Sequence, residues 1–153
     1  MAREATPYDL TITPRDRRFG RGEATTRWWH GGDPVATALY NALSATFPRG
    51  EAFFVESVRL FREGANPKLA AEIKAFTTQE VMHSREHVQF NKRAHEAGYD
   101  LTKLEQRVEW RLSLVRERAP IASLAATMAL GHFTPILAHE LVKDPRHPPR
   151  GRA

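Results

Sequence analysis

The chain has 153 residues, a formal net charge of +5 and no cysteine. This length fits one domain with a sizeable core. The lack of cysteine excludes a disulfide framework, thiolate zinc sites and cysteine nucleophiles, so glutamate, aspartate and histidine remain as candidate metal ligands. We find no apolar run long enough to span a bilayer, and the N-terminus lacks the apolar segment of a secretory signal. We therefore expect a cytoplasmic protein without a membrane span.

The basic charge raises the question of a nucleic-acid partner. Arginine outnumbers lysine 18 to 5, but the basic residues form no sustained block, and many have an acidic residue close by. The exceptions are the two termini, at 15–27 and 146–152. Because a run of charge is usually a solvated surface or tail, we expect no nucleic-acid binding.

Three regions are expected along the chain. Residues 1–30 are polar and irregular and end in two tryptophans, so they predict an arm that packs its aromatic rings on the body. Residues 31–143 carry the helical signals and are expected to form a metal-binding domain. Residues 144–153 are rich in proline and arginine, and their composition predicts disorder.

Helix signals follow one another from residue 33 onward. Asp33 and Pro34 predict an N-cap and a first helical residue, and this helix should run to about residue 46. Proline and glycine interrupt the pattern at 48 and 50, and a second helical segment covers 51–63. The two pieces form either separate helices or one kinked helix.

The later helices have clearer limits. The longest is predicted from Pro67 to about residue 97, with Gly98 as its terminator. A capping-box spacing at Thr102 predicts a shorter helix to about residue 118. A further helix begins at 120 and runs to about 142, with a proline inside it. Short connections between four or five helices favour an all-α bundle.

The predicted 67–97 helix carries ionisable residues in its apolar stripe. Steps of three and four residues define the one face that a bundle buries. Along this face lie Leu69, Ile73, Phe76, Glu80, His83, His87, Phe90 and Ala94. Burying a carboxylate and two imidazoles is costly unless a partner or a metal ion compensates them. Glu-x-x-His on an inward face is also the ligand pattern of carboxylate-bridged di-metal bundles, so the stripe predicts a metal site.

Other ligands must come from facing helices. Glu51 shares a face with apolar residues and is either an inward ligand or a first-turn acid favoured by the helix dipole. His132 and His139 are seven residues apart on the last helix, and they are either additional imidazole ligands or ordinary polar positions. The sequence gives no support for a phosphate-binding loop, for a serine nucleophile on a strand-to-helix turn, or for zincin spacing.

Several motifs together resemble a known family. In order along the chain these are Trp29-His-Gly-Gly-Asp-Pro34, Asn41-Ala-Leu-Ser44, Phe47-Pro-x-Gly-Glu-x-Phe-Phe54, Ser57-Val-Arg59, Phe76-x-x-Gln-Glu-x-x-His83 and His87-x-x-x-Asn91. The chain resembles the bacterial family of predicted transition-metal-dependent hydrolases over roughly residues 28–140. The resemblance implies a ferritin-like helical bundle of di-iron type, with metal ligands at Glu51, Glu80 and His83.

The chain departs from the family pattern towards its end. Gly131 stands before His132 where the family usually carries a glutamate, and the second Glu-x-x-His is absent from the sequence, so we expect a shortened, incomplete bundle. Two functions remain open. One is a metal-dependent enzyme that uses iron, or zinc or manganese, for hydrolysis or oxygen chemistry on a small-molecule substrate. The other is a truncated, non-catalytic helical protein, in either case with a homodimer as a possible assembly.

Overall fold

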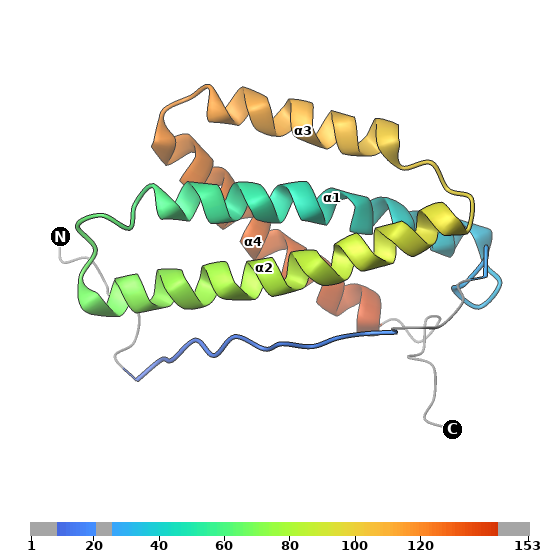
Figure 1. The fold of residues 1–153 in the computed structure, drawn as a ribbon, viewed down its shortest axis with the longest axis horizontal. Coiled ribbons are helices and arrows are strands. Elements are labelled where there is room, and N and C mark those ends of the chain that lie inside the picture. The colour runs from blue at the N-terminus through green and yellow to red at the C-terminus, as the bar shows by residue number, and fades with distance from the viewer. Residues whose placement is uncertain (1–8, 21–25, 144–153) are drawn as a thin grey trace.

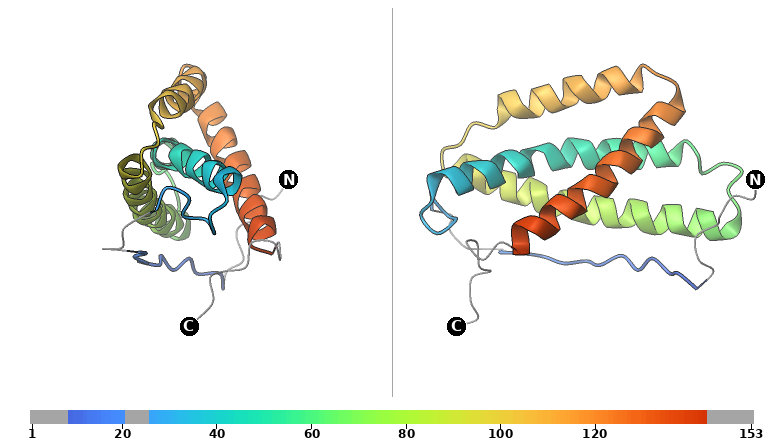
Figure 2. Two further views of the ribbon diagram at one scale, coloured as in Figure 1. Left: turned by 90° about the vertical axis from the view of Figure 1, so that its right-hand side faces the viewer. Right: turned by 180° about the vertical axis from the view of Figure 1, so that it is seen from behind.

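A computed structural model describes residues 9–20 and 26–143. In these two ranges the chain has four helices and no strand, which confirms the predicted all-α bundle (Figure 1). The helices are α1 (Pro34–Arg59), α2 (Pro67–Glu96), α3 (Thr102–Arg116) and α4 (Pro120–Lys143). Helix α1 contacts each of the other three and lies at the centre of the bundle (Figure 2). The predicted disordered tail at 144–153 lies outside the described residues.

Helix α1 is continuous through the predicted interruption. Pro48 lies inside it, and a proline in this position cannot donate a hydrogen bond to the carbonyl four residues earlier, which is that of Ser44. The side-chain amide of Asn91 on α2 donates to this carbonyl instead, at 3.3 Å. The predicted alternative of one helix is therefore the correct one, because a neighbouring helix compensates the backbone group that the proline leaves.

The helix ends confirm most of the local signals. The carboxylate of Asp33 accepts hydrogen bonds from the first turn of α1, and α2 ends before Gly98, whose φ is +89°. The predicted capping box at Thr102 is wrong. Leu101 is the N-cap of α3 and makes no side-chain cap bond, and the Thr102 amide donates to the carboxylate of Asp100.

The interior of α1 is unusually polar. Its fully buried residues include Thr37, Asn41, Glu51 and Ser57, with Phe53 the largest apolar one. Ser57 is satisfied between helices, by the 2.6 Å contact of its hydroxyl with that of Thr127, which joins α1 to α4, and Asn41 accepts from the Trp29 ring of the arm. Short polar side chains let the helix axes approach closely, but each requires a partner.

The N-terminal arm lies along α2, parallel to it (Figure 1). The Arg15 amide donates to Gln79, and the Phe19 amide donates to Glu86 further along the same helix. After the undescribed residues 21–25, the ring of Trp29 packs edge-on against Phe90, with ring centres 5.2 Å apart. The arm thus covers the outer face of α2 beside its histidines.

Helix α4 crosses α1 obliquely (Figure 2). It exposes much of its apolar surface. Met128 and Phe133 are 67% and 66% exposed. No apolar run long enough to cross a bilayer was expected from the sequence. Pro120–Leu141 of α4 is nevertheless one by length and composition, with a mean hydropathy of 1.5 over its most apolar window. Only 11% of that window is buried. Exposed apolar surface of this extent is common at sites of interaction with proteins or membranes.

Candidate metal centre

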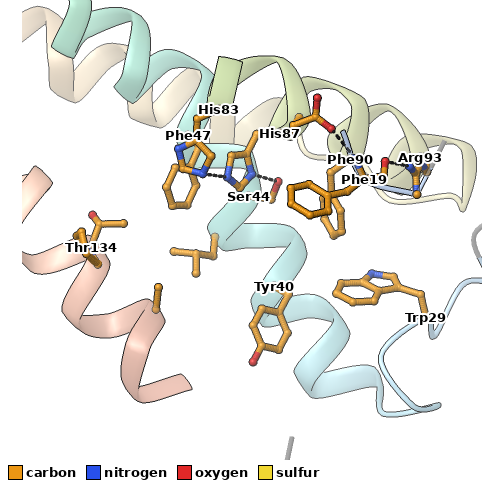
Figure 3. A pocket seen from close by; sticks show the side chains of 15 residues that line it. Phe19, Trp29, Tyr40, Ser44, Phe47, His83, His87, Phe90, Arg93 and Thr134 are labelled. Carbon is orange, nitrogen blue, oxygen red and sulfur yellow. Dashed lines mark hydrogen bonds between the residues drawn. The ribbon is translucent and has the colours of Figure 1, made fainter. Parts of the chain in front are cut away.

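Three of the candidate ligands meet between α1 and α2. Ligand atoms of Glu51, His83 and His87 all lie within 4.8 Å of one another. Glu51 comes from α1, and the two histidines lie one turn apart on α2, so that both rings project from the same face (Figure 3). No other group of three potential ligands meets this condition among the described residues.

Glu51 is the most deeply buried of the three. The residue is 1% exposed, and neither carboxylate oxygen accepts a well-formed hydrogen bond. Its closest polar neighbour is Nδ1 of His83, 2.7 Å from Oε1, although this contact lacks the alignment of a hydrogen bond. A buried carboxylate without donors is costly unless a cation balances it, and the imidazolium form of His83 or a metal ion can do so.

The second ring is held in one tautomer. Nδ1 of His87 lies 2.8 Å from the hydroxyl of Ser44, and this hydroxyl donates to the side-chain carbonyl of Asn91 at 2.7 Å. Because a serine hydroxyl has one proton, Ser44 must accept from His87. The proton of His87 is therefore on Nδ1, and its Nε2 carries a free lone pair. The ring also stacks on Phe47, with ring centres 4.1 Å apart.

This lone pair faces the other histidine. Nε2 of His87 lies 3.2 Å from Nε2 of His83. Two nitrogens with lone pairs repel at this distance, so a proton or a metal ion must lie between them. When each nitrogen is about 2.0–2.1 Å from one zinc ion, a separation of 3.2 Å is compatible with tetrahedral coordination. The donor set and its spacing therefore fit a divalent transition metal.

Electrostatics separate the two rings. The carboxylate of Glu51 beside His83 raises the pKa of that ring, with burial acting in the opposite direction. Burial lowers the pKa of His87 to about 4, and the neighbouring His83 adds to the effect. At neutral pH His87 is thus a neutral imidazole, the form that binds metal. At His83, by contrast, a proton competes with a metal ion for the ring nitrogen.

Glu80 lies close to this group without being one of the three. It is partly buried, and burial followed by the nearby charge of Glu51 raises its pKa to about 6. With Glu51 it lines a pocket of about 460 Å³. His87, also a predicted ligand, belongs to the group of three, and Glu80 stays a predicted ligand beside it.

The histidines of α4 are not brought to the group. His132 is exposed and lines a separate pocket with Val58 and Phe76, and His139 is also exposed. Gly131 has no atom near the place where a side chain would begin. Helix α4 therefore contributes no ligand from these positions.

Sequence reasoning did not assign a role to Ser44 or Asn91. Their spacing contained the signal, because Ser44 is seven residues before Glu51 and Asn91 is four residues after His87. Those separations place each on the same helix face as a ligand. A polar residue in the same stripe as a predicted ligand therefore indicates a group that orients it.

The comparison with known families agrees with this site. Residues 13–151 match the family described as predicted metal-dependent hydrolase, and the chain belongs to that family. No curated protein and no solved structure matches the chain. The chain is thus a helical member of a metal-dependent family with a Glu/His/His group between its first two helices.

Proposed function

We propose that the chain is a metal-dependent hydrolase that binds one divalent ion through Glu51, His83 and His87. The observation that carries the proposal is the buried Glu51 carboxylate, which has no hydrogen-bond donor and lies beside two converging imidazoles. Iron, zinc and manganese all accept this mixture of ligands. We take iron as the first candidate, since glutamate and histidine ligands from facing helices are typical of iron sites in helical bundles.

A bound ion would polarise a substrate carbonyl and activate water for attack on it. Hydrolysis adds the oxygen of water to the carbonyl carbon, breaks the bond to the leaving oxygen or nitrogen, and moves one proton of water to the leaving group. Glu80 is suited to accept that proton and return it, because a carboxylate with a pKa of about 6 is mostly ionised at neutral pH and only weakly acidic. Ser44 and Asn91 keep the lone pair of His87 directed at the ion.

A two-ion centre would require more bridging carboxylates than Glu51 and Glu80. We therefore expect one ion per chain, and hydrolysis rather than oxygen chemistry. Elemental analysis after dialysis, combined with hydrolysis of a p-nitrophenyl ester by protein loaded with iron, zinc or manganese, tests both points. One ion per chain together with metal-dependent turnover supports the proposal, and two tightly held ions would contradict it.

The exposed positions of His132 and His139 favour a second candidate. With no ligand from α4, the chain is then a non-catalytic helical protein whose partial site binds metal weakly. The ester assay separates the two candidates, since this one predicts weak metal binding without turnover. A Glu51→Gln variant provides the baseline for both measurements.

A further inference from the structure

We propose that the pocket beside the two histidines binds a neutral, apolar carbonyl compound, such as an aromatic or medium-chain amide or ester. This proposal rests on the proposed function, because it assigns the class of substrate to that site. The pocket has a volume of about 590 Å³, within the range of pockets for small organic ligands. We call it the aromatic pocket.

Four parts of the chain build the aromatic pocket (Figure 3). Its lining comes from α1, the histidine face of α2, the C-terminal half of α4 and the arm. Most lining side chains are aromatic or aliphatic, namely Phe19, Trp29, Tyr40, Leu43, Phe47, Phe90, Pro135 and Ala138. Such walls favour an apolar ligand, because each apolar group that leaves water contributes favourably to binding.

The charged groups at the edge of the aromatic pocket are already engaged with the arm. Arg93 donates to the backbone carbonyl of Phe19 at 3.2 Å, and Glu86 accepts from the backbone amide of the same residue at 3.0 Å. Glu86 also receives a hydrogen bond from Arg85. A charged ligand would have to displace these contacts or lose its hydration without compensation. The lining therefore selects against both anions and cations.

The two histidines form a polar end of the aromatic pocket. His83 and His87 both line the aromatic pocket, and the Nδ1 atom of His87 is held by Ser44. An ion held by the opposing Nε2 atoms would offer a carbonyl oxygen a contact that the lone pair of His87 alone does not. An apolar body with one carbonyl at its end matches this arrangement of apolar walls and a single polar end.

The experiment compares three ligands of one shape and different charge. Isothermal titration of the chelator-treated full chain with 4-phenylbutanamide, 4-phenylbutanoate and 4-phenylbutylammonium measures the preference without a metal ion. We expect saturable binding of one amide per chain, and binding at least about tenfold weaker for both charged analogues, since each must lose hydration. Tighter binding of either charged analogue, or no binding of the amide, would overturn the proposal.

Matched variants place the ligand in the aromatic pocket. Ala138→Phe fills it from α4 and should weaken amide binding at least about tenfold, whereas Ala125→Phe, on the same helix and outside the pocket lining, should change it less than about twofold. Phe19→Ala removes a wall that belongs to no helix, so it weakens binding even if Ala138→Phe folds poorly. Equal affinities in Ala138→Phe, Phe19→Ala and wild type would place the ligand elsewhere.

The outcome is distinct from that of the metal proposal. Amide binding without metal uptake would retain the aromatic pocket and reject the metal site. Metal uptake without amide binding would do the reverse. Repeating the titration with added zinc shows whether the two sites are adjacent, because the amide should then bind more tightly in wild type and not in Glu51→Gln.

Discussion

Half of the buried residues on α1 and α2 are polar, whereas on α4 the large apolar side chains are exposed. Glu51, Ser44 and Asn91 are at most 5% exposed, and Phe133 on α4 is 66% exposed. A buried polar group stabilises the fold only when it has a partner, and an exposed apolar surface marks a place where another molecule binds. Both regions thus depart from the usual arrangement of an apolar interior and a polar surface.

Replacing one phenylalanine in each region should give the largest difference in stability between them. Phe53 on α1 is 1% exposed, and Phe133 on α4 is 66% exposed. We expect Phe53→Ala to lower the free energy of unfolding by about 3–5 kcal/mol, since it leaves a cavity in the interior. Phe133→Ala should change it by less than about 0.5 kcal/mol. Urea unfolding followed by circular dichroism measures both. Equal losses would mean that α4 is packed in solution.

The buried carboxylate gives the next largest effect. Glu51→Gln should weaken metal binding at least about a hundredfold, because it removes the buried charge at the site. In metal-free protein the same change should lower stability mainly below about pH 6.5, because it removes the charged partner of protonated His83. Glu56→Gln, on the exposed side of α1 where Glu56 accepts from Arg116, is the control and should leave metal binding unchanged. Competition with a chromophoric zinc chelator gives the affinities.

Protons should compete with metal at His83. Its pKa is raised by Glu51. As the pH is lowered, metal affinity should therefore begin to fall at a pH above the ordinary imidazole pKa of about 6.5, and it should decline up to about tenfold for each pH unit below that point. His87, with a pKa of about 4, stays neutral throughout. Zinc titrations between about pH 5 and about pH 8 test this. An affinity that does not change with pH would exclude His83 as a ligand.

In metal-free protein the raised pKa of His83 has the opposite consequence, because protonation then stabilises the fold. The contact of protonated His83 with Glu51 stabilises the folded state fully below the unfolded imidazole pKa of about 6.5. This contribution is lost as the pH rises through the raised pKa of the folded state. His83→Ala should therefore reduce the melting temperature more at low pH than at high pH when metal is absent, and added zinc should raise the melting temperature of wild type alone.

Replacing Ser44, a buried polar residue between α1 and α2, should reduce metal affinity less than replacing Glu51. Ser44→Ala removes the group that holds the tautomer of His87, and we expect about a tenfold loss of metal affinity. Thr46 lies on the same helix, and its hydroxyl donates to the backbone carbonyl of Leu43. Thr46→Ala should therefore have no such effect. An NMR spectrum of the His87 ring nitrogens should show mixed tautomers in Ser44→Ala. An unchanged tautomer would assign the control of His87 to another group.

Polar substitutions on the exposed face of α4 should change the stability of the fold least and the association of chains strongly. We expect a homodimer through its apolar surface, so Met128→Gln together with Phe133→Gln should favour the monomer while the unfolding free energy changes by about 0.5 kcal/mol or less at each exposed site. Light scattering measures the mass, and Leu60→Gln, exposed at the end of α1, is the control. A wild-type monomer would remove the homodimer from the proposal.

Local signals in the sequence determined the helices. Asp33 as an N-cap, the start of α2 at Pro67 and its end before Gly98 follow from backbone preferences of single residues and were predicted correctly. The face that carries Glu80, His83 and His87 follows in the same way from the helical repeat. Within the described residues, the existence of a polar stripe on α2 therefore needed no tertiary information.

Only the tertiary structure decided which groups meet. The crossing of α1 and α2 places Glu51 beside His83 and gives Ser44 to His87, and it supplies the Asn91 amide that keeps α1 continuous at Pro48. The oblique path of α4 leaves its histidines away from that group. Helix periodicity fixes the face on which a side chain lies, but the depth and angle at which two helices pack depend on the shapes of both faces together. A single stretch of sequence does not contain that information.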